Sequence, residues 1–167
     1  MALTIETGAG VENADSYVEV ADLDSFASER GITSLPATEP EKEALLRLAF
    51  DYVESHRRRF NGVKTNEGNT FPQFPRTGLT IDGEEVDENT VPREVKLAQM
   101  QLAIDAVDQD LAPTGDGRAI IREKVDVLET QYDSGASGAP QPIFAKANAW
   151  LDPLFRNGGF LGATLRV

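Results

Sequence analysis

The chain has 167 residues, enough for one domain with a single hydrophobic core and short for two. It contains no cysteine, which excludes disulfide bonds, thiolate metal sites and cysteine nucleophiles. Its 28 acidic residues against 16 lysines and arginines give a formal net charge of −12, which disfavours a protein that holds nucleic acid by its phosphates.

No segment suggests a membrane protein or an exported one. The first six residues lack a basic region followed by a long apolar run. No stretch approaches the roughly 20 apolar residues of a membrane span. We therefore expect no membrane partner, and the absence of cysteine suits a reducing cytoplasm.

The N-terminal region alternates short apolar stretches with turn formers. Residues 3–5 could form a small strand, and Gly8 and Gly10 mark a turn. Side-chain caps then lead into a short helix over about 20–30, which Gly31 ends.

A second helix is predicted over 39–60. Thr38 and Glu41 have the spacing of a capping box, and Pro40 falls in the first turn. Apolar or partly apolar residues recur at helical spacing, which predicts one buried face: Leu45, Leu48, Tyr52, Val53, His56 and Phe60.

Residues 61–90 contain many asparagine, glycine and proline residues and are predicted to form a long loop. A loop of this length in a compact protein is usually functional or disordered. Its apolar residues Phe71, Phe74 and Leu79 indicate that it packs on something. Residues 82–88 are strongly acidic and should be solvated.

A third helix is predicted over 91–111, with Pro92 in its first turn. Its apolar residues occupy two stripes, so that much of its circumference is apolar, which is typical of a helix at the centre of a fold. The helix should end before Pro113.

The C-terminal part changes character. Residues 122–132 partly alternate and favour a strand, and residues 133–140 have the composition of a linker. A last helix is predicted over 142–154, and residues 155–167 are interpreted as an extended arm. These elements together predict a mainly α protein: a small helical bundle with a minor β element, a long internal loop and an extended C-terminal arm. The domain would cover 1–154 and the arm 155–167.

No pattern indicates catalysis. His56 is the single histidine, and we interpret it as a packing or capping residue. The acidic run at 82–88 lacks the ligand spacing of a calcium loop. Gly8 and Gly10 lack the third glycine of a dinucleotide motif, and residues 115–118 lack the lysine of a phosphate-binding loop. We therefore expect no enzyme, no catalytic residue, no cofactor and no metal.

Arg57, Arg58 and Arg59, with Arg47 earlier and Phe60 after them, form the one basic concentration in the sequence. They could contact a phosphate backbone. In so acidic a protein we favour the alternative, that they pair with an acidic surface on the same or a neighbouring subunit.

Several segments taken in order resemble a family of tailed-phage structural proteins, the head–tail adaptor (connector) group, whose members are often described as DnaT-like single-stranded DNA-binding proteins. The resemblance covers nearly the whole chain. Members of the group usually have tryptophan where Phe74 stands, and the C-terminal arm here is longer than is typical. The segments that carry the resemblance are 8–17, the arginine run after the second helix, 74–78, 91–95, 122–125 with Tyr132, and the closing short helix.

The resemblance implies a structural subunit in the virion neck, made in the cytoplasm of a bacterial host. It implies a homo-oligomer, a dodecameric ring below the portal protein, which would also contact downstream neck or tail proteins. The genome DNA would pass through the lumen without specific binding. Portal or subunit contacts would come from the C-terminal arm, with these anchors: Phe155, Phe160, Leu161, Leu165 and Val167. Phe71, Phe74 and Arg76 of the long loop would brace either the subunit's own core or the ring interface.

The alternative hypothesis is a replication protein that binds single-stranded nucleic acid. Arg57, Arg58 and Arg59 would contact phosphates, and Phe60 would stack on a base. The net charge of −12 argues against this alternative, although a local patch can outweigh the overall sign.

Overall fold

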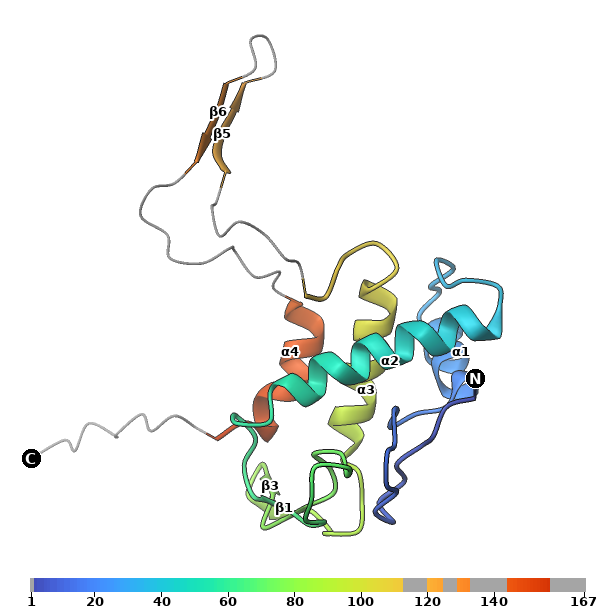
Figure 1. Cartoon of the computed structure of the whole chain (residues 1–167), viewed down its shortest axis with the longest axis vertical. Helices are drawn as coiled ribbons and strands as arrows, with labels where there is room; N and C mark the ends of the chain where they lie inside the picture. Colours follow the sequence, from blue (N-terminus) through green and yellow to red (C-terminus); the bar gives the residue numbers. More distant parts are fainter. Residues whose placement is uncertain (1, 113–119, 125–128, 133–143, 157–167) are drawn as a thin grey trace, which may run out of the picture.

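The computed structural model describes residues 2–112, 120–124, 129–132 and 144–156 (Figure 1). These residues contain four α-helices and a short 3-10 helix, η1. The helices are α1 (Val20–Glu29), α2 (Glu39–Ser55), α3 (Arg93–Asp105), α4 (Ala145–Leu151) and η1 (Asp152–Leu154).

The same residues contain three separate antiparallel strand pairs, β1 with β2, β3 with β4, and β5 with β6. Their bounds are β1 (Val63–Lys64), β2 (Arg76–Thr77), β3 (Thr80–Ile81), β4 (Glu84–Glu85), β5 (Ile120–Lys124) and β6 (Glu129–Tyr132). The protein is therefore a small mixed fold, and the expectation of a mainly α helical bundle is wrong.

The fold differs from the expectation mainly because residues 61–90, predicted as a loop, form strands. The turn formers of this segment do not leave the backbone unpaired, because they fold it back twice, into β1–β2 and β3–β4. Val63 pairs with Thr77 in the first ribbon, and Thr80 pairs with Glu85 in the second. Cross-strand pairing satisfies the backbone groups that a structureless loop would leave to water.

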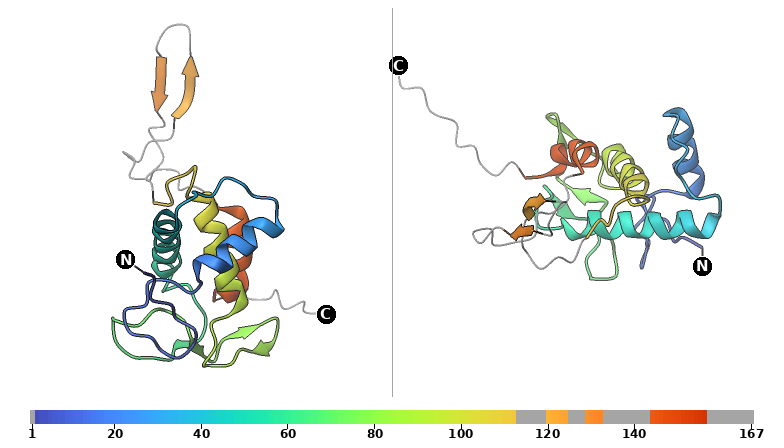
Figure 2. Two further views of the ribbon diagram at one scale, coloured as in Figure 1. Left: turned by 90° about the vertical axis from the view of Figure 1, so that its right-hand side faces the viewer. Right: turned by 90° about the horizontal axis from the view of Figure 1, so that it is seen from above.

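Helix α3 occupies the centre of the helical part. It packs against α2 and α4, and it also contacts α1. Figure 2 shows it lying between α2 and α4. The prediction that this helix is central is confirmed by its buried residues, which face in several directions: Val95, Leu97, Ala98, Gln99, Met100, Leu102, Ala103 and Ile104.

Gln99 on α3 ties three segments together. Its amide oxygen accepts a hydrogen bond from the Tyr17 backbone N–H at 2.9 Å. Its amide nitrogen donates to the Ser16 hydroxyl at 2.9 Å and to the Leu46 carbonyl on α2 at 3.0 Å. A buried amide with these partners fixes the N-terminal segment against α2 and α3.

Helix α2 ends at Ser55, earlier than the predicted 60. The residues after it form a turn in which the Arg59 N–H donates to the His56 carbonyl at 2.8 Å. Phe60 then forms an antiparallel bridge with Phe155. Helix α3 likewise ends at Asp105, short of the predicted 111. None of the described helices is long and apolar enough to cross a membrane.

Candidate functional site

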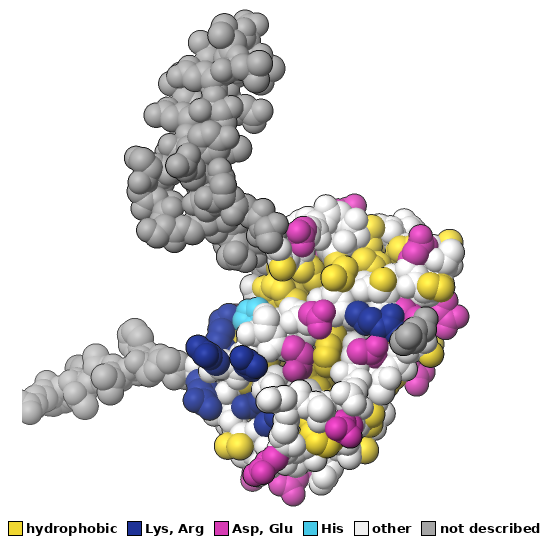
Figure 3. Space-filling view, viewed as in Figure 1, with side chains coloured by type: hydrophobic (Ala, Val, Ile, Leu, Met, Phe, Trp, Pro, Cys, Tyr) yellow, Lys and Arg dark blue, Asp and Glu magenta, His cyan; other side chains and the backbone are white. Residues whose placement is uncertain are grey.

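The turn after α2 carries an exposed group of guanidinium side chains. Arg57, Arg58 and Arg59 are exposed in this turn, and Arg156 is exposed where the chain returns after η1. The Arg156 N–H donates to the Arg59 carbonyl at 2.7 Å, and its Nε donates to the Phe60 carbonyl at 3.0 Å. We call these four arginines the basic cluster. Figure 3 shows lysine and arginine side chains gathered beside the histidine on this side of the molecule.

The positive charge of the basic cluster is not neutralised by contacts within the described residues. The ion pairs found there join Arg30 to Glu29, Lys42 to Asp24, and Arg47 to Asp15 and Glu43. No described carboxylate forms an ion pair with a member of the cluster. The predicted pairing with an acidic surface of the same chain is therefore not seen in this part of the protein, and pairing with another subunit stays a prediction.

The aromatic residues beside the basic cluster are largely turned inward. Phe60 is 0% exposed, so a base cannot stack on it in this structure. Phe155 is 9% exposed, and the Arg59 guanidinium lies 3.9 Å from the centre of its ring. This cation–π contact fixes Arg59 at the end of the cluster.

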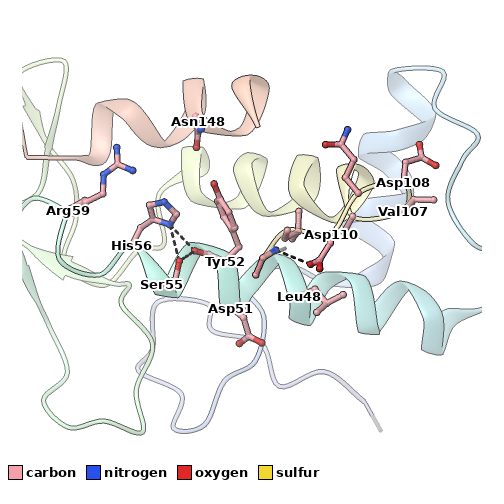
Figure 4. A pocket seen from close by; sticks show the side chains of 14 residues that line it. Leu48, Asp51, Tyr52, Ser55, His56, Arg59, Val107, Asp108, Asp110 and Asn148 are labelled. Carbon is pink, nitrogen blue, oxygen red and sulfur yellow. Dashed lines mark hydrogen bonds between the residues drawn. The ribbon is translucent and has the colours of Figure 1, made fainter. Parts of the chain in front are cut away.

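A groove of about 1070 Å³ opens beside Arg59 and follows α2 as far as Leu48. Its other wall is formed by residues 106–112, which follow α3, and by Asn148 on α4. In Figure 4 the Tyr52 side chain of α2 and the Asn148 side chain of α4 point toward each other across this groove. The groove thus combines an aromatic ring, an amide and the edge of the basic cluster.

Several polar groups in the groove have unused hydrogen-bonding capacity. The Asn148 Oδ1 atom is buried and lacks a hydrogen-bond partner among the described residues. The Tyr52 hydroxyl likewise forms no hydrogen bond there, and burial raises the pKa of Tyr52, an effect that Arg59 partly offsets. His56 Nδ1 lies 2.9 Å from the Tyr52 carbonyl and 3.1 Å from the Ser55 hydroxyl.

Acidic residues border the groove as well. Asp108 and Asp110 lie toward the Leu48 end, away from Arg59 (Figure 4). Asp51 also lines the groove, and burial, together with the nearby Asp15, raises the pKa of its carboxyl group. Among the described residues, no group of three or more potential ligand side chains could hold a metal ion.

The predicted interface residues occupy different environments. Phe74 is fully buried in the core, and Phe71 is partly buried. Arg76 is 5% exposed, and its guanidinium donates to the carbonyls of Asn61 at 2.7 Å and Gly62 at 2.9 Å. Burial and the nearby Arg156 lower the pKa of Arg76. Phe160, Leu161, Leu165 and Val167 lie outside the described residues.

Comparison with known proteins gives one family. No curated protein and no solved structure matches the chain. The comparisons do not support the narrower expectation of a phage head–tail adaptor. A family model described as "Putative DnaT-like ssDNA binding protein" matches residues 1–167. Because this match spans the full sequence, the chain belongs to that DnaT-like family.

Proposed function

We propose that the protein binds single-stranded nucleic acid through the basic cluster. The observation that carries this proposal is the gathering of four exposed guanidinium groups from two chain segments, none paired with a described carboxylate. Guanidinium groups bind phosphate oxygens in a bidentate manner and remain charged at all relevant pH values. The description of the family points to the same class of ligand.

The acidic net charge limits the paths that a bound nucleic-acid strand can take over the protein surface. Asp82 lines a surface hollow together with Arg156, so the approach from the β3–β4 turn brings phosphates near a carboxylate. The groove beside Arg59 offers the other approach. At physiological ionic strength charges act over about 8 Å, so the local sign at the cluster matters more than the total of −12.

The proposal is tested by measuring the binding of a fluorescent single-stranded oligonucleotide by anisotropy. The triple variant Arg57→Gln, Arg58→Gln, Arg59→Gln should weaken binding by about tenfold or more, because it removes three phosphate contacts. A matched triple variant, Arg93→Gln, Lys96→Gln, Lys146→Gln, removes the same charge elsewhere and should have a much smaller effect. Equal losses in both variants, or no binding by the unmodified protein, would contradict the proposal.

A second candidate function is supported by the net charge of −12 and the exposed carboxylates of 84–88. In this candidate, copies of the chain form a ring in the neck of a tailed phage, between the portal and tail proteins. An acidic lumen would repel DNA and let the genome slide through it.

This second candidate is tested by mixing the protein with a portal protein encoded beside it and imaging the product by electron microscopy. A ring stacked on the portal with matching symmetry is the expected result. If the protein stays monomeric and does not associate with the portal at micromolar concentration, the adaptor function is excluded.

A further inference from the structure

We infer that the end of the groove nearest Arg59 holds one unpaired base of the bound strand, between the Tyr52 ring and the Asn148 amide. This inference rests on the proposed function, and it specifies how that site contacts the strand beyond its phosphates. Sequence-independent binding of single strands combines a basic surface with aromatic rings on which bases stack. Because Phe60 is buried, the stacking group has to come from elsewhere.

Tyr52 is placed to supply that ring. It lines the groove, and its neighbours on the protein side are Phe144, at 5.4 Å between ring centres, and His56, at 4.8 Å. Both neighbours meet it at tilted or perpendicular angles, 44° for His56 and 88° for Phe144, so neither ring stacks flat against it. The contacts orient Tyr52 while it remains part of the groove wall.

Asn148 gives the second observation that supports a base in the groove. Its Oδ1 atom is buried and has no hydrogen-bond partner among the described residues. A buried acceptor without a partner costs free energy, and each unsatisfied group in a folded protein calls for an explanation. Every base carries at least one N–H donor on its Watson–Crick edge, so a bound base would satisfy this oxygen while its ring stacks on Tyr52.

The charges fix which end of the groove is used. Arg59 belongs to both the basic cluster and the groove wall, so a phosphate held by the cluster places the attached base at the His56 and Tyr52 end. Asp108 and Asp110 border the opposite end and would repel a second phosphate. The volume of about 1070 Å³ lies just above the usual range of ligand sites, about 300–1,000 Å³, so one base fits without filling the groove.

The test compares two oligonucleotides of equal length, one with ordinary bases and one with abasic sites along its centre. Tyr52→Leu should weaken binding of the base-containing strand by about tenfold, the order expected for one stacked base. Asn148→Leu should weaken it by about fivefold, the order expected for one lost hydrogen bond. Neither should change binding of the abasic strand. Tyr52→Phe keeps the ring and should bind both strands as the unmodified protein does. Thermal unfolding checks that every variant is folded.

The possible outcomes separate this inference from the proposed function. If the unmodified protein binds neither strand, the proposed function fails. If it binds both strands equally, or if the leucine variants weaken both equally, the cluster binds phosphates but the groove holds no base. If the leucine variants change sedimentation of the protein alone and leave binding intact, the groove is a contact between copies of the chain, and the inference is overturned.

Discussion

Glu54 is a carboxylate held largely inside the fold. The Tyr17 hydroxyl donates to it, and the Gln73 backbone N–H donates to both of its oxygens at 3.1 Å. The Phe74 N–H in turn donates to the Tyr17 hydroxyl at 3.2 Å. This network joins the N-terminal segment, α2 and the segment before β2 through the Glu54 carboxylate and the Tyr17 hydroxyl.

Burial raises the pKa of Glu54, and its hydrogen bonds to Tyr17 and Gln73 offset only part of that effect. The folded state therefore holds the proton of Glu54 to a higher pH than the unfolded state does. Between the ordinary glutamate value of 4.5 and the raised value, the folded state binds more protons, so stability falls as pH rises. The stability contributed by the raised pKa of Glu54 is fully present below the unfolded pKa and is lost as pH rises through the folded pKa.

Glu54→Gln should remove this contribution, because glutamine keeps an acceptor for Tyr17 and carries no charge. The variant should gain stability relative to the unmodified protein as pH rises above the ordinary glutamate value of 4.5. Urea unfolding across this range measures the difference. The exposed Glu67→Gln is the control, and a Glu54→Gln difference that stays constant with pH would show that burial does not govern this carboxyl group.

At the scale of elements, η1 and the two residues after it close over the end of α2. The Asn61 N–H donates to the Leu154 carbonyl at 2.8 Å, and Phe155 stacks on Phe60 with ring centres 5.4 Å apart. The Arg59 guanidinium also lies against the Phe155 ring, 3.9 Å from its centre. The basic cluster thus depends on this segment for its position.

Phe155→Ala should therefore destabilise the fold by about 3 kcal/mol, near the lower end of values for truncating a buried phenylalanine. The ring lies at the edge of the core, where the cavity left behind is partly open to water. Leu48→Ala is a suitable control, because Leu48 is 54% exposed and its loss should cost about 0.5 kcal/mol or less. Equal losses in urea unfolding would contradict the assigned packing.

The helices show what local sequence can and cannot predict. The starts of α1 and α2 follow from local signals, although the Thr38 hydroxyl bonds the Glu41 carboxylate instead of capping the helix backbone. The end of α2 at Ser55 has no local signal, because no glycine or proline stands between Ser55 and Gly62. Phe60 fits helical spacing, yet it is buried by contacts with the distant Phe74 and Phe155, and such long-range contacts leave no local signal.

Some residues of the candidate site can be predicted from local sequence and others cannot. Arg57, Arg58 and Arg59 stand out in the sequence because they are consecutive. The helical spacing of Tyr52 with neighbouring apolar residues also marks it in the sequence. That pattern predicts a buried face of the helix, but it cannot show that Tyr52 lies at the edge of this face and borders a groove. Asn148 has no such signal, because its importance arises only when α4 packs opposite α2.

For the whole molecule, the central question is how an acidic protein holds a polyanion. The basic cluster follows the C-terminal end of α2, and Glu39 begins the same helix. With a rise of about 1.5 Å per residue, the 17 residues of α2 separate these two places by about 25 Å. Asp82, in contrast, lines the same hollow as Arg156 of the cluster. The two carboxylates therefore probe long-range and short-range repulsion separately.

Asp82→Asn should strengthen oligonucleotide binding at both low and physiological ionic strength, because Asp82 lies close to the bound phosphates. Glu39→Gln should strengthen it only at about 0.01 M salt, where charges act over about 30 Å, and not at about 0.15 M, where they act over about 8 Å. Each gain should be about twofold or less, as expected for one exposed charge. Anisotropy titrations at the two salt concentrations measure both effects. Equal gains from the two variants at 0.15 M would mean that the strand does not bind at the basic cluster but spreads over the surface that α2 spans.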